Sequence, residues 1–383
     1  MPYITINIRP KTHQLTFDDI WNLDTSWLGS NKDTHDTRTE WVDETSTRYI
    51  NFINHIYFSD MIKAIKYYNE KYKSLREVDR QSLYRSFKIP KRTGGFRQID
   101  APNEELSNAL YELKYLFEQR LYANHHTIAF AYCNGRSTYD AVARHQANDS
   151  KWLLKMDLHG FFPSTTPEFL YNQLTKIFPF NELVHFNGME AEIKKMLDLC
   201  FLNGGLPQGT PMSPMLTNLM MIPIDCKLVE YCRNHKPMLV VTRYADDIHI
   251  SSKYNFRWTE VQNSIVSIFE QAHAPFTLNR EKTHYGSRSG RNWMLGLMYN
   301  QNGDITIGHQ RKKLLKVSIF NFLNDYKNNI HWSLEDLQVL QGNISYARMI
   351  EKSSIDAVVQ AYNSKFNASL DDTIKAEIKR ATI

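Results

Sequence analysis

The 383-residue sequence lacks the features of a secreted or membrane-spanning protein. It has no run of about 18 apolar residues that could cross a bilayer. Its N-terminus has no basic stretch followed by an apolar one, so we expect no secretory leader. It has only four cysteines, none in a CxxC pair, which argues against a disulfide scaffold or a cysteine zinc site. We therefore expect a cytoplasmic protein with reduced thiols and no membrane partner.

Low complexity and internal repeats are also absent. Hydrophobic residues make up 42% of the chain and aromatic residues 13%, which is enough to build a sizeable core and excludes disorder for most of the sequence. The length exceeds that of one ordinary domain of about 100–200 residues. We therefore expect a globular protein with more than one structural unit.

Positive charge is unevenly distributed along the chain. The sequence has 46 Lys and Arg against 41 Asp and Glu, a net charge of +5. Residues 1–72 have eight basic and ten acidic side chains, residues 73–97 have eight and two, and residues 311–329 have five and one. Such clusters are common on solvated surfaces, but they are also typical of surfaces that bind a polyanion.

The pattern of apolar residues predicts an α+β protein. Alternating residues on both sides of Gly94 and Gly95 predict a β-hairpin over 87–99. Further predicted elements are a short strand at 152–157, two strands meeting at a tight turn over 238–252, a hairpin over 292–308, and helices over 17–28, 59–72, 103–150, 165–203, 214–232, 257–273 and from 310 onward. Ser213 and Pro214 are the predicted N-cap and first residue of their helix. Strands and helices that do not alternate regularly favour an α+β fold over one built from regular βαβ units.

Three aspartates stand beside predicted strands. Asp246 and Asp247 occupy the tight turn, where a pair of acidic residues is by itself often only a turn former. Asp157 ends another apolar strand, and if the two strands are neighbours in one sheet the three carboxylates converge. Carboxylate oxygens suit Mg²⁺, and two such ions about 3.5–4 Å apart can support phosphoryl transfer. The pattern therefore predicts a metal-dependent phosphoryl-transfer site.

The residues around these aspartates form three blocks: Met156–Ser164 (MDLHGFFPS), Gly205–Asn218 (GLPQGTPMSPMLTN) and Tyr244–Asp247 (YADD). In this order the blocks resemble the bacterial reverse transcriptases of the retron-type and group II intron-like branch. The resemblance covers roughly residues 83–350 and implies an RNA-directed DNA polymerase with a right-hand fold. It divides the chain into an N-terminal extension (1–72), fingers (73–150), a palm with the catalytic carboxylates (151–309) and a helical thumb (310–383).

The resemblance implies that Asp157, Asp246 and Asp247 are the catalytic residues and the ligands of two Mg²⁺ ions, with Mn²⁺ as a possible substitute. It also implies a role in nucleotide binding for Lys91, Arg97, Phe162, Gln208 and Lys282. Lys91 and Arg97 match the residues that grip the triphosphate, although Lys88 and Arg92 are alternatives to Lys91. Arginine suits this contact because it is always charged and can bind phosphate with two hydrogen bonds.

The other three nucleotide-binding residues have more specific implied roles. Phe162 would pack against the deoxyribose and exclude a 2′-hydroxyl group, and Gln208 would contact the incoming nucleotide. Lys282 would act as a general acid towards the leaving pyrophosphate. Without the resemblance, Phe162 would be assigned to the core, Gln208 to a plain turn and Lys282 to the surface.

The same resemblance implies contacts with template and primer. Arg136 and Ser137 match a template-side element, and Gly296 and Leu297 lie in the hairpin that holds the primer end. The basic segment 311–329 resembles the thumb helix that follows the duplex through backbone contacts. The implied partners are an RNA template, typically a cognate non-coding RNA, a DNA or RNA primer, deoxynucleotides, and either a protein partner or a second copy of the chain.

Two elements of retron enzymes are only partly present. An Asn-Ala-x-x-His element corresponds to residues 141–145, and a Val-Thr-Gly element to residues 294–296, where only His145 and Gly296 are kept. We therefore expect closest kinship with reverse transcriptases of anti-phage defence. The alternatives are a retron-type enzyme that makes multicopy single-stranded DNA, an untemplated or protein-primed polymerase, and an inactive RNA-binding scaffold. We expect His145, His249 and His284 to be packed or hydrogen-bonded side chains rather than metal ligands.

Overall fold

The computed structural model describes residues 58–90, 94–121, 123–288 and 294–382. Residues from Phe58 to Ile383 form one compact unit. Within the described residues, no helix is both long and apolar enough to cross a membrane. The predicted helix over 17–28 and Lys91, which is predicted to bind the nucleotide, lie outside the described residues.

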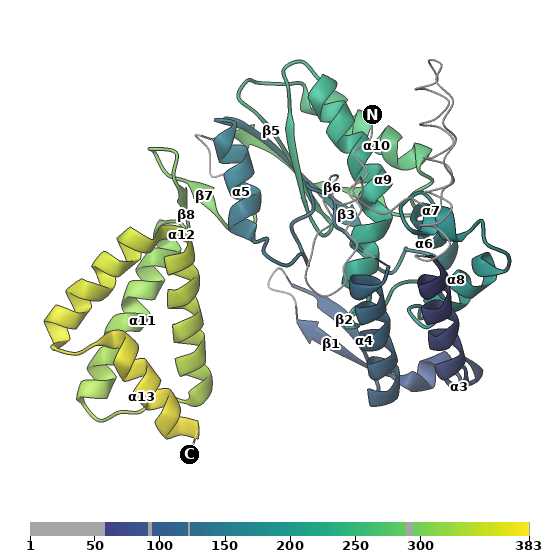
Figure 1. Cartoon of the computed structure of the whole chain (residues 1–383). Coiled ribbons are helices and arrows are strands. Elements are labelled where there is room, and N and C mark those ends of the chain that lie inside the picture. The colour runs from purple at the N-terminus through teal and green to yellow at the C-terminus, as the bar shows by residue number, and fades with distance from the viewer. Residues whose placement is uncertain (1–57, 91–93, 122, 289–293, 383) are drawn as a thin grey trace, which may run out of the picture. The chain divides into compact units, whose positions relative to one another are not determined.

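A four-stranded antiparallel sheet holds the centre of the fold (Figure 1), with the strand order β4-β5-β3-β6. Its strands are β3 (Trp152–His159), β4 (Val240–Tyr244), β5 (Asp247–Ser252) and β6 (Thr277–Ser287). The helices in contact with it are α5 (Thr138–Ala147) and α9 (Ser213–Asn234), both against β4, and α10 (Trp258–Gln271), against β6. Strand β3 continues two residues past Asp157, so the prediction that this aspartate ends its strand was wrong: β6 pairs with residues 157–159 and extends the strand.

Two smaller sheets are formed by segments that come before and after the central sheet in the sequence. The hairpin of β1 (Tyr84–Pro90) and β2 (Phe96–Pro102) confirms the predicted basic hairpin, and β7 (Met298–Tyr299) with β8 (Ile305–Thr306) confirms the second one. The remaining elements before the thumb are helical: α3 (Ser74–Glu77), η2 (Arg80–Leu83), α4 (Glu104–Gln119), α6 (Pro167–Leu174), α7 (Phe180–Leu183) and α8 (Met189–Asp198). Residues 58–71 are also helical.

The structure corrects two local expectations. The stretch 103–150 is not continuously helical, because α4 ends at Gln119 and residues 123–137 form turns up to α5. Ser213 is the first residue of α9 rather than its N-cap. The N-cap is Met212, which makes no side-chain capping bond, and the Ser213 N–H donates instead to the hydroxyl of Thr210 at 3.3 Å. A helix boundary that differs by one residue has little consequence, but the irregular 123–137 segment contributes directly to the candidate site.

The C-terminal helices form their own packed layer. They are α11 (His309–Lys327), α12 (Leu334–Phe366) and α13 (Leu370–Thr382). Their apolar faces share a core with Met294, Leu297 and the β7–β8 hairpin. Helix α12 is interrupted at Glu351, whose backbone is non-helical and whose carboxylate accepts hydrogen bonds from the Ile307 N–H at 2.8 Å and the Thr306 hydroxyl at 2.7 Å. The kink therefore joins α12 to the end of the hairpin.

The four cysteines of the sequence are all free thiols. Cys133, Cys200 and Cys232 are buried, and Cys226 is exposed on α9. Burial raises the pKa of the Cys232 thiol to about 12 and also raises the pKa of Cys200. The buried thiols are therefore protonated at neutral pH, as expected for structural cysteines.

Candidate active site

The three aspartates predicted as catalytic lie at one end of the central sheet. Asp157 on β3 is paired in register with Asp247, the first residue of β5. The N–H of Leu158 donates to the carbonyl of Asp246 at 3.0 Å. The expected adjacency of the two strands is therefore confirmed, and it brings carboxylates 89 residues apart in the sequence to the same end of the sheet.

The turn that carries Asp246 has a strained backbone. Tyr244 pairs with Asp247, so Ala245 and Asp246 form the connection between β4 and β5. Ala245 has a φ of 56°, in the left-handed region that residues other than glycine seldom adopt. Its carbonyl accepts a hydrogen bond from the buried Arg243 at 3.2 Å. Surrounding contacts thus hold the residue before Asp246 in an unfavourable conformation, as is common at functional sites.

Two lysines balance the negative charge of the aspartates. Lys282 donates to Asp157 Oδ2 at 3.0 Å, and Lys155 Nζ lies 3.1 Å from Asp247 Oδ1. Burial raises the pKa of the Asp246 carboxyl, and the charges of Asp247 and Asp157 raise it further. The hydrogen bond to Asp157 raises the pKa of Lys282, which therefore stays charged. The end of the sheet is thus a site where negative charge is concentrated and cations are attracted.

A β-bulge directs Lys282 towards Asp157. Lys155 pairs with His284 and Asp157 pairs with Asn279, so residues 280–283 of β6 stand opposite Met156 alone. Bulges of this kind change the direction of a side chain next to a functional site. The sequence predicted the role of Lys282 by resemblance, and the bulge supplies the geometry that the sequence did not show.

The oxygen donors of the three aspartates fit a divalent cation, because hard cations prefer carboxylate ligands. As the described side chains stand, no three His, Cys, Asp or Glu residues converge closely enough to hold an ion. Two of the carboxylates are instead engaged by the ammonium groups of Lys155 and Lys282. Asp157 and Asp247 are therefore paired with cationic groups, while Asp157, Asp246 and Asp247 stay the predicted metal ligands.

Backbone contacts connect Phe162 and Gln208, both predicted to bind the nucleotide, with neighbouring segments. The Leu206 N–H donates to the carbonyl of Phe162 at 3.1 Å, and the Asp100 N–H donates to the carbonyl of Gln208 at 2.7 Å. A Cβ atom at Gly205 would collide with the backbone of Pro163, so this close approach requires glycine. The structure therefore connects Phe162 and Gln208 with strand β2, which carries Arg97.

Arg97 is exposed on β2, opposite Ile89. Tyr132 is within electrostatic reach of both Arg97 and the catalytic turn: its pKa is raised mainly by burial and then by Asp246, while Arg97 lowers it. The role of Arg97 in nucleotide binding stays a prediction. The role of Lys91 in gripping the triphosphate stays a prediction.

The residues predicted to contact the template are engaged within the protein. Arg136 Nη1 donates to the carbonyls of His126 and Ala129 at 2.7 and 2.6 Å. Ser137 caps α5 in a reciprocal capping box with Asp140. These contacts fix the 126–137 segment, and the template contact of both residues stays a prediction.

The residues predicted to hold the primer lie in a tight turn before β7. Gly296 has a φ of 78°, and its carbonyl accepts from Arg311 Nη1 at 2.7 Å. Leu297 is fully buried in the core of the C-terminal helices. Its side chain therefore anchors the turn, and a primer could reach only the exposed part of the turn.

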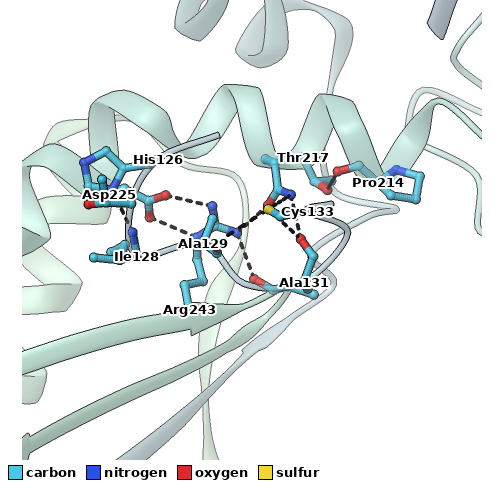
Figure 2. Close-up of polar contacts among 12 residues, drawn as sticks. His126, Ile128, Ala129, Ala131, Cys133, Pro214, Thr217, Asp225 and Arg243 are labelled. Carbon is cyan, nitrogen blue, oxygen red and sulfur yellow. Dashed lines mark hydrogen bonds and ion pairs between the residues drawn. The ribbon is translucent and has the colours of Figure 1, made fainter. Parts of the chain in front are cut away.

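A buried polar network supports the catalytic turn from behind (Figure 2). Arg243 on β4 donates to Asp225 through Nε at 2.9 Å and Nη2 at 2.7 Å, and to Asn218 Oδ1 at 3.1 Å. Asn218 in turn donates to the carbonyl of Ala131 at 2.8 Å. This network was not among the features predicted from the sequence. Two features of the sequence could have indicated it: Arg243 lies inside the otherwise apolar strand Val240–Tyr244, and Asp225 lies inside the largely apolar helix α9.

The expected histidine roles are confirmed in part. His145 is fully buried and hydrogen-bonded to Ser251 Oγ at 2.6 Å and to Thr242 Oγ1 at 2.8 Å. His249 is buried as well, and its ring nitrogens have no hydrogen-bond partner among the described residues.

A palm sheet with acidic residues at its end, joined to a basic hairpin and followed by a helical domain, defines the class of template-directed nucleic-acid polymerases. The family model described as reverse transcriptase (RNA-dependent DNA polymerase) matches residues 89–323. The chain therefore belongs to the reverse transcriptase family, with the α+β right-hand polymerase fold, and is an RNA-directed DNA polymerase that uses divalent metal ions.

Several relatives of the chain are retron enzymes. The chain is 26% identical to the Retron Ec83 reverse transcriptase of Escherichia coli over 291 residues, which cover 73% of this chain and 86% of that protein. It is 29% identical to the Retron Mx162 reverse transcriptase of Myxococcus xanthus, covering 60% and 49% of the two chains. Among solved structures, apo telomerase from Candida Tropicalis aligns with a TM-score of 0.45 and 14% identity over 78% of this chain and 63% of that one.

Proposed function

We propose that the chain copies an RNA template into DNA at the end of the central sheet, with Asp157, Asp246 and Asp247 holding two Mg²⁺ ions. The observation that carries this proposal is the in-register pairing of Asp157 with Asp247, which places acids from two sequence blocks side by side. Bound ions of this kind activate a primer 3′-hydroxyl group and stabilise the leaving pyrophosphate. Mn²⁺ is a chemically similar substitute.

The chain's own residues supply the other parts of the reaction. Lys282, held charged beside Asp157, is positioned to give a proton to the leaving pyrophosphate. Phe162 limits space at the sugar, Gln208 contacts the nucleotide, and Arg97 with Lys91 binds its phosphates. The template would run past Arg136 and Ser137, and the primer end would rest near Gly296 and Leu297.

We propose that fingers, palm and thumb extend over 73–150, 151–309 and 310–383. Helix α11 of the thumb exposes Lys313 and Lys316, together with Leu314, whose side chain is 67% exposed. Basic side chains on a helix suit the phosphates of a template–primer duplex. Residues 58–72 pack against the body, for example through Asn69 and Glu192, whose side chains are 2.7 Å apart.

The template is proposed to be a cognate non-coding RNA. Relatives named as retron reverse transcriptases support a retron-type role, in which the product is multicopy single-stranded DNA. A role in anti-phage defence stays a prediction. Sequencing the nucleic acid that copurifies with the protein would distinguish one abundant structured RNA, which supports the proposal, from random cellular RNA, which contradicts it.

Primer extension tests the activity. The purified protein with its copurifying RNA, Mg²⁺ and labelled deoxynucleotides should make DNA, and prior RNase treatment should abolish the product. Product that survives RNase would instead support untemplated or protein-primed synthesis. Asp246→Asn should abolish synthesis without loss of RNA binding. Asp60→Asn, a change at a 69% exposed side chain, should leave synthesis unchanged. Synthesis by Asp246→Asn at a comparable rate would contradict the metal-site assignment.

A further inference from the structure

Three cationic side chains surround one carboxylate at the end of the central sheet opposite Asp157. The carboxylate belongs to Asp149, and the cations lie 3.9 Å (Lys151), 3.5 Å (Lys253) and 3.6 Å (Arg288) from it. Among the described residues, these three cations form no ion pair with another acid. One acid therefore serves three positive charges, and two of the charges are uncompensated.

The contacts of this cluster are loose. All three distances exceed the roughly 2.7–3.2 Å of a well-formed hydrogen bond, and the side chains of Asp149, Lys151 and Lys253 are 54%, 56% and 48% exposed. Exposed ion pairs of this kind are weak. Arg288 is held more firmly, because its guanidinium group lies 4.5 Å from the centre of the Tyr299 ring. A phosphate group can therefore bind between two exposed lysines and a restrained arginine without first breaking a strong ion pair.

Aromatic rings adjoin the cluster. Trp152 begins β3, and its ring stacks on that of Tyr285 with centroids 5.6 Å apart and planes inclined by 18°. Tyr285 stacks in turn on Trp258, at 6.2 Å and 23°. These three rings are half-buried, and Tyr254, which directly follows Lys253, is 63% exposed. Aromatic rings beside cations offer nucleobases a surface on which to stack.

We call this surface the distal rim and define it by Asp149, Lys151, Trp152, Lys253, Tyr254 and Arg288. Trp152 pairs with Ser252 and Ser287, the last residues of β5 and β6, so the rim is the end of the sheet opposite the paired Asp157 and Asp247. At about 3.3 Å per residue, the stretch of β3 from Trp152 to Asp157 spans about 17 Å. The distal rim is therefore separate from the candidate active site.

The cations and the rings of the distal rim face different sides of the sheet. The Lys151 N–H donates to the carbonyl of Ser252 at 2.9 Å, so the strand pairing extends to this residue. Because successive side chains of a strand point to opposite faces, Lys151 and Trp152 lie on opposite sides. A flexible single strand that crosses the rim can contact the cations with its phosphates and the rings with its bases. A duplex is stiff over this distance and can follow only one side.

We propose that the distal rim binds a single-stranded segment of the RNA, outside the part that is paired with the primer or being copied. Uncompensated positive charges match phosphates, and exposed aromatic rings match unpaired bases, whereas an acidic protein segment would use only the charges. The inference rests on the proposed use of an RNA template. The rim keeps the RNA attached to the protein while synthesis proceeds at the other end of the sheet.

Affinity for the copurifying RNA tests the contribution of the cations. Lys151→Gln/Lys253→Gln should weaken binding of the labelled RNA about tenfold or more in fluorescence anisotropy. Since each phosphate contact contributes about 0.7 to the salt dependence of single-strand binding, the slope of log Kd against log salt should fall by about 1.4. Lys63→Gln/Lys194→Gln removes two other exposed lysines, so it is the matched control and should change neither quantity.

A ring variant tests the stacking of bases. Tyr254→Leu should weaken binding of the same RNA about fivefold or more without changing the salt slope, because it removes a stacking surface but no charge. Tyr67→Leu, at a 65% exposed ring on the helix over 58–71, should leave the affinity unchanged. In hydroxyl-radical footprinting, the protection lost in the lysine double variant should fall in an unpaired stretch of the RNA. Protection lost within the primer–template duplex would overturn the proposal.

Extension of a short primer–template separates the distal rim from the site of synthesis. A template with only a short overhang cannot reach both ends of the sheet, so the wild-type protein and the lysine double variant should extend it with equal KM. A raised KM in the variant would place the lysines at the site of synthesis and overturn the proposal.

The remaining outcomes distinguish this proposal from the proposed function. Equal affinity for the copurifying RNA in the lysine double variant and its control would overturn the proposal and assign the rim to a partner other than RNA. DNA synthesis together with that result contradicts the rim alone. Loss of RNA affinity in the variant, with no DNA synthesis by the wild-type protein, supports the rim and contradicts the proposed function.

Discussion

Arg243 and Asp225 form a fully buried ion pair with two hydrogen bonds, of 2.9 and 2.7 Å. The arginine belongs to the strand that leads into the catalytic turn, and the aspartate belongs to α9. Because Arg243 also donates to the carbonyl of Ala245, the pair fixes the backbone directly before Asp246. The position of Asp246, a predicted catalytic residue, therefore depends on a buried interaction between β4 and α9.

Asp225→Asn should strongly destabilise the protein. Removing one charge leaves Arg243 buried without its counter-ion, which costs about 3–5 kcal/mol. Urea denaturation measures the loss in free energy of unfolding. Glu190→Gln, which breaks the exposed pair with Lys194, is the matched control and should cost less than about 1 kcal/mol. Equal unfolding midpoints for Asp225→Asn and the wild-type protein would contradict this account.

Lys282→Met should reduce catalysis. The lysine side chain is 63% exposed, so its removal leaves no buried gap, but it removes the predicted proton donor beside Asp157. Single-turnover incorporation should slow by about 10²–10⁴-fold, the usual contribution of general acid–base catalysis. Arg280→Met, two residues earlier on β6, is the control. If both variants slow synthesis equally, Lys282 acts only through the surface charge of the strand.

Phe162→Ala should weaken sugar discrimination. Phe162 is half-buried and packs edge-on against Phe161, with ring centroids 5.6 Å apart. Truncation opens space where a 2′-hydroxyl group would otherwise clash, so the ratio of kcat/KM for ribonucleotides over deoxynucleotides should rise. Phe161→Leu, at a 2% exposed core position, should lower stability and leave the ratio unchanged. An unchanged ratio in Phe162→Ala would remove the residue from the nucleotide site.

Gly205→Ala should disrupt the link between Phe162 and Gln208. The new Cβ atom would meet backbone atoms of Pro163, which cannot rotate away as a side chain can. We expect a lower free energy of unfolding and a raised KM for deoxynucleotides, measured by urea denaturation and steady-state extension. Gly342→Ala in α12, where the space is open, should instead stabilise the protein by about 0.5–1 kcal/mol. Full activity and stability in Gly205→Ala would contradict the close approach.

Acid should destabilise the fold through His145. Burial, with smaller effects from the charges of His249 and Arg144, lowers its pKa to about 3 from the ordinary 6.5. Between these values the unfolded chain binds the additional proton, so stability falls as the pH falls through about 6.5. His145 alone should contribute roughly 1–2 kcal/mol to the loss between pH 7 and pH 5 in urea denaturation. His249, whose pKa is also lowered to about 3 by burial, adds a loss of the same sign.

His145→Gln provides the comparison for this pH dependence. Glutamine can bond to Ser251 and Thr242 but does not titrate, so the variant should show a smaller loss between the two pH values. An identical loss in variant and wild-type protein would show that other groups carry the pH dependence.

The local patterns of the sequence predicted much of the site. Alternation around Gly94 and Gly95 gave the basic hairpin, and apolar residues flanking Asp246 gave the β4–β5 turn. The pairing of β3 with β5 could only be assumed from the sequence, because a local pattern of residues does not determine which distant strands pair or in which register. For the same reason, the ion pair of Lys155 with Asp247 and the bulge at Lys282 could not be predicted. These contacts arise from strand register and helix packing rather than from neighbouring residues.

The distribution of the thiols offers a practical route to several of these measurements. Cys226 is the exposed cysteine, while Cys133, Cys200 and Cys232 are buried and protonated at neutral pH. A maleimide dye should therefore attach at one site in the unmodified protein, on the helix that also carries Asp225. The natural sequence thus provides a single labelling position beside the polar network, from which fluorescence could follow RNA loading without engineering a cysteine-free background.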